Sequence, residues 1–166
     1  MSPVVVLVGP PGSGKSTIAA VLSKRLGVEH RDTDTDIEAS AGKPISEIFV
    51  DEGEPHFRRL ERAAIVEALK GDGQVLSLGG GAILDAATRA DLAGQTVVFL
   101  DVSLGEASKR VGLSVARPLL FGNVRTQLRN LMEARRPLYS EVAKLTVTTD
   151  NRTPDEIADE ILEHLG

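Results

Sequence analysis

The stretch Val4–Thr17, VVVLVGPPGSGKST, decides the fold of this chain. It opens with a continuous apolar run, mostly β-branched, which predicts a strand that is buried on both faces. The segment Gly9–Ser16 then matches G-x-x-x-x-G-K-[ST], and Lys15–Leu26 carries apolar residues at helical spacing, with Gly27 placed to end the helix. A strand, a glycine-rich turn and a helix in this order predict a loop that binds phosphate groups through its backbone amides and the helix N-terminus.

The residues of this loop have distinct expected roles toward a bound nucleotide. The glycines let backbone amides converge on phosphate oxygens, Lys15 reaches the β- and γ-phosphates, and the Ser16 hydroxyl ligates Mg²⁺. The residues expected to bind the nucleotide phosphates are Gly12, Ser13, Gly14, Lys15, Ser16 and Thr17. The alternative is a plain glycine-rich turn that caps a helix, and the loop does not identify the group that accepts the phosphate.

The rest of the chain continues to alternate strands and helices. Further strands are predicted at Gln74–Leu78, Thr96–Leu100 and Leu145–Thr149, and helices at Glu54–Lys70, from Ser103 toward Val111, at Val124–Arg136 and from Thr153 onward. A short second strand should end at Arg31. This alternation predicts an α/β fold in which helices sandwich a parallel five-stranded sheet and ligands bind at the carboxyl ends of the strands.

Length and composition limit the classes of function. The 166 residues fit one domain, and the absence of cysteine excludes disulfides and thiolate metal sites and fits a cytoplasmic location. The net charge of −5 argues against nucleic acid as the main partner, because nucleic-acid binding usually needs a basic face. No segment approaches the roughly 18 consecutive apolar residues of a membrane span. We therefore expect a cytoplasmic monomer that binds small molecules and neither nucleic acid nor membrane.

Two carboxylates, Asp32 and Asp34, follow the second predicted strand. At a spacing of i, i+2 on an extended segment they point the same way, so one can reach a metal while the other faces an acceptor hydroxyl. A solvated acidic turn or a helix N-cap is the alternative, since aspartate is common at both. The adjacent phosphate loop favours the functional interpretation, because phosphoryl transfer needs Mg²⁺ and an oriented nucleophile.

Further motifs, in their order and spacing, resemble those of the shikimate kinase family over about Val4 to Leu165. The matching segments are GPPGSGKST at Gly9–Thr17, DTD at Asp32–Asp34, G-x-x-I-x-E-I-F-x-x-x-G-E-x-x-F-R-x-x-E at Gly42–Glu61, SLGGGA at Ser77–Ala82, RPLL at Arg117–Leu120 and R-x-P-L-Y at Arg135–Tyr139. The resemblance implies transfer of the γ-phosphate of ATP to the 3-hydroxyl of shikimate, giving shikimate 3-phosphate and ADP. This reaction is a step of chorismate and aromatic amino acid biosynthesis.

The resemblance also implies residues that bind the acceptor. Asp34 would bind the acceptor hydroxyls and orient or deprotonate the attacking oxygen, and Arg58 and Arg135 would hold the shikimate carboxylate. Gly80 and Gly81 would contribute close backbone contacts. Residue chemistry agrees, because a planar guanidinium binds a carboxylate in bidentate fashion and a glycine admits close approach of a ligand.

Each arginine has an alternative role. Arg58 could be an ordinary helix-surface arginine that pairs with Glu54 or Glu61. Arg136 is adjacent to Arg135, but only Arg135 takes the matching place in R-x-P-L-Y, so we expect Arg136 to be a surface charge.

On the nucleotide side, the resemblance implies one Mg²⁺ per subunit, held by Ser16 and supported by Asp32. A lid at about residues 111–124 would carry Arg117 over the phosphates, where it stabilises the charge that develops during transfer. A mobile basic loop is the alternative for this segment. Lys15, Asp34 and Arg117 are thus the expected catalytic residues.

The adenine would lie between Arg110 and Pro154, with Arg152 nearby. Pro154 also has a structural explanation as the first residue of a helix. The whole chain, residues 1–166, would form a single domain of the P-loop NTPase fold. Its parts would be the phosphate loop at 9–17, a helical substrate-binding insertion at about 33–61 and the lid loop.

Two other readings remain open. The strand that ends at Asp101 looks like one that supports Mg²⁺ in other nucleotide-binding proteins, although a role at the entry of the next helix is the better interpretation. The chain could also be a related kinase that acts on gluconate or a nucleoside monophosphate, or a non-catalytic nucleotide-binding module. The set of Asp34, Arg58 and Arg135 suits a carboxylated polyol better than a phosphorylated acceptor.

Overall fold

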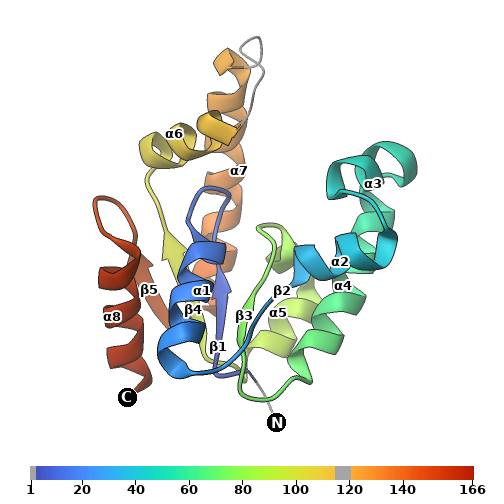
Figure 1. Cartoon of the computed structure of the whole chain (residues 1–166). Helices are drawn as coiled ribbons and strands as arrows, with labels where there is room; N and C mark the ends of the chain where they lie inside the picture. The colour runs from blue at the N-terminus through green and yellow to red at the C-terminus, as the bar shows by residue number, and fades with distance from the viewer. Residues whose placement is uncertain (1–2, 115–120) are drawn as a thin grey trace.

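The computed structural model describes residues 3–114 and 121–166 of the chain. Five parallel strands form one sheet in the order β2-β3-β1-β4-β5, with β1 in the centre (Figure 1). The strands are β1 Val5–Val8, β2 His30–Asp32, β3 Val75–Ser77, β4 Val97–Asp101 and β5 Leu145–Thr148. The predicted α/β architecture with a parallel five-stranded sheet is therefore confirmed.

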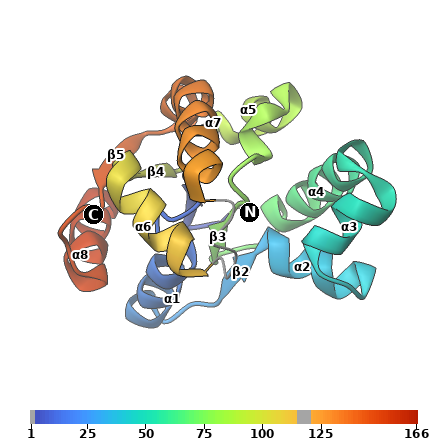
Figure 2. The ribbon, with the colours of Figure 1, turned by 90° about the horizontal axis from the view of Figure 1, so that it is seen from above.

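Helices cover both faces of the sheet, because successive residues of a strand point to opposite faces. Val5 and Leu7 of β1 belong to a core with α1 (Lys15–Leu26) and α8 (Pro154–Leu165). Val6 and Val8 belong to a second core on the other face. The helices of that second core are α4 (Glu54–Leu69), α5 (Ala86–Leu92) and α7 (Phe121–Val142), and the view from above shows the two helical layers (Figure 2).

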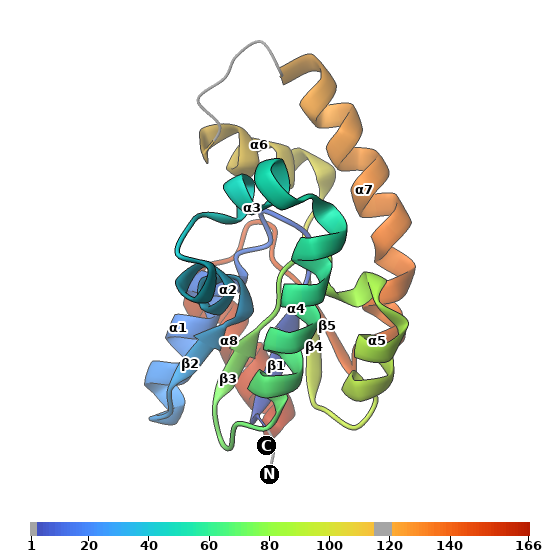
Figure 3. The same cartoon turned by 90° about the vertical axis from the view of Figure 1, so that its right-hand side faces the viewer.

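Three helices form a projection beside the sheet (Figure 3). They are α2 (Thr33–Ala41), α3 (Ile45–Glu52) and the first part of α4, and they enclose a small core of Ile37, Ile48 and Phe57. This projection coincides with the predicted insertion at about 33–61, which is indeed helical. It attaches to the sheet through β2 and places the start of α2 and the start of α4 next to the strand ends.

Both described ends of the segment expected to be a lid loop, at about 111–124, are helical. Helix α6 (Leu104–Ser114) continues to Ser114 and α7 begins at Phe121. Each end includes one glycine, and a glycine inside a helix costs only about 1 kcal/mol, which helical context can override. Arg117 lies outside the described residues.

Helix ends follow the sequence signals in most places. Gly27 ends α1 in the left-handed conformation at φ 68°, as predicted. Thr153 and Glu156 form a reciprocal capping box at the start of α8. At the start of α6 the Glu106 amide donates to the Ser103 hydroxyl at 3.2 Å, but the Ser103 amide donates to Asp150 at 3.0 Å and not to Glu106, so only half of such a box forms.

Helix α7 runs past its predicted end at Arg136. Pro137 lies inside it and cannot donate a backbone hydrogen bond. The helix continues because Tyr139 and Val142 pack into the core on the far side of the proline. Over the described residues, no helix combines the length and apolar character needed to cross a membrane.

Candidate active site

The glycine-rich loop between β1 and α1 surrounds the side chain of Lys15. The Lys15 ammonium donates to the carbonyl oxygens of Gly9 at 2.7 Å and Pro10 at 3.2 Å. Burial lowers the pKa of Lys15 to about 8, and the carboxylates of Asp34 and Asp32 oppose this shift. A cation is therefore held inside the loop, close to two carboxylates, as a phosphate-binding role requires.

Asp32 ends β2 and serves two partners. One carboxylate oxygen accepts from the Asp34 amide at 2.9 Å and so caps α2, while the other accepts from the Ser16 hydroxyl at 3.2 Å. Asp34 consequently lies in the first turn of α2, and the prediction that both carboxylates lie on an extended segment is wrong. Asp32 is therefore the N-cap of α2, which was one of the two expected roles. This does not exclude a role at a metal ion, because its second carboxylate oxygen contacts Ser16.

Ser16 and Asp32 together suit Mg²⁺. Both offer hard oxygen donors beside the phosphate loop, and Mg²⁺ is usually held by one or two protein oxygens together with substrate phosphates and waters. In the parts of the chain that the structure describes, no group of three or more acidic, histidine or cysteine side chains could hold a metal by itself. Ser16 and Asp32 therefore fit a Mg²⁺ ion that binds together with a nucleotide.

The carboxylate of Asp34 is packed against the turn that follows β3. A Cβ atom on Gly79 would lie 2.6 Å from Asp34 Oδ1, so only glycine leaves room for this carboxylate. That oxygen is buried and has no hydrogen-bond partner among the described residues. Burial and the nearby charge of Asp32 raise the pKa of Asp34 to about 6. A buried acceptor with no protein donor is ready to receive a hydroxyl group of a ligand.

Arg58 is held on the acceptor side of the site by two glutamates. It donates to the almost fully buried Glu61 at 2.8 Å and to Glu54 at 3.3 Å, and its guanidinium lies 5.2 Å from the Phe57 ring centroid. Arg58 thus pairs with Glu54 and Glu61, as expected for an arginine on a helix surface. This pairing does not remove Arg58 from the site, because a Cβ on Gly81 would lie 2.6 Å from the guanidinium nitrogens.

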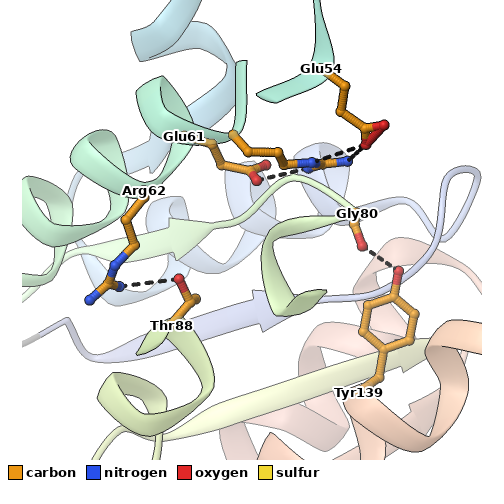
Figure 4. Close-up of polar contacts among 7 residues, drawn as sticks. Glu54, Glu61, Arg62, Gly80, Thr88 and Tyr139 are labelled. Atoms are coloured by element: carbon orange, nitrogen blue, oxygen red, sulfur yellow. Dashed lines mark hydrogen bonds and ion pairs between the residues drawn. The ribbon is translucent and has the colours of Figure 1, made fainter. Parts of the chain in front are cut away.

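Arg135 of α7 also lies close to the glycine turn. Its Nη1 atom lies 3.6 Å from the place that a Cβ of Gly80 would take. Tyr139, one turn further along α7, donates from its hydroxyl to the Gly80 carbonyl oxygen at 2.6 Å (Figure 4). Burial raises the pKa of Tyr139 to about 12, although the charge of Arg135 acts in the other direction. Helices α4 and α7 therefore present two guanidinium groups to Gly80 and Gly81.

The phosphate loop, Asp32, Asp34 and the turn after β3 open into one cavity of about 440 Å³, whose lining includes neither Arg58 nor Arg135. Its lining combines the phosphate loop, the two carboxylates and the glycine turn: Pro11, Gly12, Gly14, Lys15, Ser16, Thr17, Asp32, Asp34, Leu78, Gly79, Gly80 and Arg110. The fold brings these segments together because the loop after β1, the end of β2 and the turn after β3 share the carboxyl edge of the sheet.

The predicted adenine residues line a neighbouring cavity of about 230 Å³. Arg110, Arg152 and Pro154 meet there beside Ser13 and Thr17. The Arg110 guanidinium donates to the Gly12 carbonyl at 2.7 Å, and Arg152 donates to Glu160 at 2.7 Å, so both arginines are held in place by protein contacts. The arrangement offers a planar, partly apolar slot beside the phosphate loop.

A family profile described as shikimate kinase matches residues 11–166. This chain belongs to the shikimate kinase family. A protein named shikimate kinase from Salinispora arenicola is 58% identical over 161 residues, which cover 97% of this chain and 96% of that protein. The shikimate kinase of Salinispora tropica is 59% identical over the same shares of both chains. A solved structure of shikimate kinase from Acinetobacter baumannii in complex with shikimate superposes with a TM-score of 0.91 at 36% identity and covers 99% of this chain and 93% of that one.

Within this family member, Arg136 is more than the surface charge that the sequence suggested. Its Nη1 atom contacts both carboxylate oxygens of Asp101 at 2.7 Å, which ties α7 to the end of β4. Asp101 is therefore engaged by a cation, and it also accepts from the Val102 amide. The expectation of a helix-entry role for Asp101 fits these contacts better than a role at Mg²⁺.

Two residues near the site carried no role in the sequence reasoning although its motifs contain them: Gly79 makes room for Asp34, and Tyr139 holds Gly80. The pairing of Glu61 with Arg58 was expected only as an alternative, and it is present. Each contact joins segments that are distant in sequence or depends on which way a helix face points. Burial raises the pKa of Glu61, while the hydrogen bond from Arg58 and the charges of Arg58 and Arg135 oppose this shift.

Proposed function

We propose that this protein transfers the γ-phosphate of ATP to the 3-hydroxyl of shikimate and releases shikimate 3-phosphate and ADP. The observation that carries the proposal is the turn at Gly79–Gly81, which brings Asp34, Arg135 and Arg58 close to three successive glycines. Membership of the shikimate kinase family and the shikimate bound in the Acinetobacter baumannii relative support the same acceptor.

Two arginines facing each other suit the carboxylate of the acceptor. A guanidinium binds a carboxylate through two parallel N–H donors, so a pair of them fixes both the position and the plane of a rigid acid. Arg58 is already oriented by Glu54 and Glu61, which lowers the entropy that it loses on binding. Phe49 and Phe57, whose ring centroids are 4.8 Å apart, would form an apolar wall beside the ring of the acceptor.

Asp34 would accept a hydrogen bond from the attacking hydroxyl. The packing of Asp34 against Gly79 fixes the direction of its carboxylate, and Asp34 lines the cavity that the phosphate loop also lines. With its pKa near 6, Asp34 would be largely ionised at neutral pH and could orient the hydroxyl or take its proton.

Lys15 would bind the β- and γ-phosphates by exchanging the carbonyl oxygens of Gly9 and Pro10 for phosphate oxygens. The backbone amides of the loop would hold the remaining phosphate oxygens at the N-terminus of α1. The adenine would enter the slot between Arg110 and Pro154, with Arg152 at its edge. Catalysis in this arrangement consists mostly of positioning and of stabilising charge.

Ser16 and Asp32 would hold one Mg²⁺ ion, Ser16 as a ligand and Asp32 through its hydrogen bond to Ser16 or through water. When bound there, the ion would supply positive charge that offsets the negative charge developing on the phosphates during transfer. Arg117 would add a second positive charge from the lid. We further propose that the chain acts as a cytoplasmic monomer with the single-domain organisation set out above.

A coupled assay for ADP release tests this function. Purified protein would receive ATP, Mg²⁺ and, in separate reactions, shikimate, quinate, gluconate or a nucleoside monophosphate. We expect turnover with shikimate and none that matches it with the other acceptors. Turnover with gluconate or a monophosphate, and none with shikimate, would leave the phosphate loop in place but overturn the acceptor assignment. ATP binding without turnover on any acceptor would favour a non-catalytic module.

A further inference from the structure

Tyr139 is buried between the sheet and the glycine turn of the acceptor site. Its side chain is only 1% exposed, and its ring packs on Phe99 of β4 with centroids 5.0 Å apart. The hydroxyl donates to the Gly80 carbonyl oxygen at 2.6 Å. This is a short bond from the last turn of α7 to the loop after β3, so it fixes one relative to the other.

The bond sets the direction of the peptide between Gly80 and Gly81. In a trans peptide the carbonyl and the following amide point in opposite directions, so a Gly80 carbonyl turned toward Tyr139 turns the Gly81 amide away from it. Glu54 and Glu61, which hold Arg58, lie on that other side of the turn (Figure 4). Within the described residues, the Gly81 amide donates to no protein acceptor.

The same helix places Arg135. Residues four apart on a helix share a face, so Arg135 and Tyr139 both face the glycine turn, and Arg135 Nη1 lies close to Gly80. Pro137 between them removes one backbone hydrogen bond of α7 at this point. The Tyr139 hydroxyl bond thus holds the turn to the part of the helix that carries the acceptor-binding arginine.

We propose that Tyr139 is a positioning residue for acceptor binding, which acts by holding the Gly80 carbonyl so that the Gly81 amide and the Arg135 guanidinium face the bound acid together. The proposal rests on the proposed function, because it takes the ligand between Arg58 and Arg135 to be a carboxylated acceptor. In this arrangement the Gly81 amide, whose direction the Tyr139 hydroxyl sets, binds the acid together with the two guanidinium groups.

A purely structural Tyr139 would behave differently. If the residue only filled the core, phenylalanine would replace it with the same ring packing on Phe99 and no selective effect on either substrate. A positioning hydroxyl instead predicts that its loss frees the Gly80–Gly81 peptide to rotate. Acceptor binding would then weaken, while the phosphate loop, which Tyr139 does not contact through its hydroxyl, would keep its affinity for ATP.

The test compares Tyr139→Phe with Val142→Ala, which truncates a residue of the same core cluster whose apolar side chain cannot hydrogen-bond to Gly80. The KM for each substrate, kcat and the thermal unfolding midpoint would be measured for both variants and the wild type. We expect Tyr139→Phe to raise the KM for shikimate about tenfold with the KM for ATP nearly unchanged. Val142→Ala should lower the unfolding midpoint at least as much and leave both KM values near those of the wild type.

Three outcomes are decisive. A Tyr139→Phe enzyme with an unaltered KM for shikimate overturns the proposal. So does a rise in KM for shikimate that Val142→Ala reproduces at equal loss of stability, since the effect would then come from the core. If the wild type uses a different acceptor in the assay above, the proposed function fails, and the same comparison with that acceptor decides separately whether Tyr139 positions it.

Discussion

The Nη1 atom of Arg136 lies 2.7 Å from both carboxylate oxygens of Asp101. This contact joins α7 to the end of β4, directly behind the phosphate loop. The preceding residue, Arg135, turns instead to the glycine turn at Gly80. Two consecutive arginines therefore have different partners: Arg136 anchors the helix to β4, while Arg135 lies at the glycine turn, where we propose that it binds the acceptor.

Replacing these arginines in turn separates the two purposes. Arg135→Ala should raise the KM for shikimate by about 100-fold or more, because one of two carboxylate donors is lost from a buried site. Arg136→Ala should leave that KM almost unchanged and lower the free energy of unfolding by less than about 1 kcal/mol, since the pair is partly exposed. Kinetics and urea unfolding of both variants provide the check. The reverse pattern would show that Arg136, not Arg135, binds the acceptor.

Asp34→Asn should abolish most turnover and preserve nucleotide binding. Asparagine keeps the shape against Gly79 but cannot carry the negative charge that orients or deprotonates the hydroxyl. We expect kcat to fall by about 10³-fold, within the range for loss of a general base. Titration of a fluorescent ATP analogue measures the nucleotide affinity independently. Turnover within a few-fold of the wild type would exclude Asp34 as the acceptor-side carboxylate.

The raised pKa of Asp34 predicts a pH dependence of activity. If ionised Asp34 is needed for transfer, kcat/KM for shikimate should rise with pH and level off above about pH 6. The ionic strength and the concentration of free Mg²⁺ should be held constant across the profile. A profile that is flat through this range would mean that ionisation of Asp34 does not limit the reaction.

The same shift predicts an effect on stability with a definite sign. Because the folded pKa of about 6 exceeds the ordinary value of 3.8, the folded state binds the Asp34 proton more tightly than the unfolded state. Its contribution is fully present below the unfolded pKa and is lost as pH rises through the folded pKa. Asp34→Asn should therefore be more stable, relative to the wild type, at about pH 7.5 than at about pH 4, by up to about 2 kcal/mol. Urea unfolding without nucleotide or Mg²⁺ at both pH values measures this difference, and no difference would place the true pKa near its ordinary value.

Local signals in the sequence predicted the phosphate loop and the helix ends well. The run from Val4 to Lys15 fixes its own structure, since a buried strand, a glycine turn and a helix start follow one another without help from elsewhere. The family motifs also placed Asp34, Arg58 and Arg135 on one site. What local signals could not supply was the contact between distant segments.

Two residues show why. Nothing in the local sequence says that the carboxylate of Asp34 will fill the space left by the missing side chain of Gly79, since the two come from neighbouring strand ends that meet only in the sheet. Likewise, the sequence around Arg136 predicts only a surface charge. Its ion pair with Asp101 forms because the packing of α7 brings it to the end of β4. The continuation of α7 through Pro137 also depends on tertiary packing, which here overrides the local preference of proline.

The close approach of Arg58 to Gly81 leads to a last prediction. A methyl group at Gly81 would lie 2.6 Å from the guanidinium nitrogens, which are the far end of a flexible side chain and can move away. Gly81→Ala should therefore fold with little loss of stability but displace Arg58 from its place between Glu54, Glu61 and the acceptor. We expect the KM for shikimate to rise by about 10-fold or more, with the KM for ATP unchanged.

Gly94→Ala is the matched control for this substitution. Gly94 lies in a turn before β4, and a Cβ added there would meet nothing within 4 Å. The Gly94→Ala substitution introduces the same methyl group and the same change in backbone freedom as Gly81→Ala. It should therefore leave the KM for shikimate and the KM for ATP as in the wild type. If Gly81→Ala also leaves shikimate binding unchanged, then Arg58 does not bind the acceptor from the position in which Gly81 holds it, and the carboxylate clamp would have to rest on Arg135 alone.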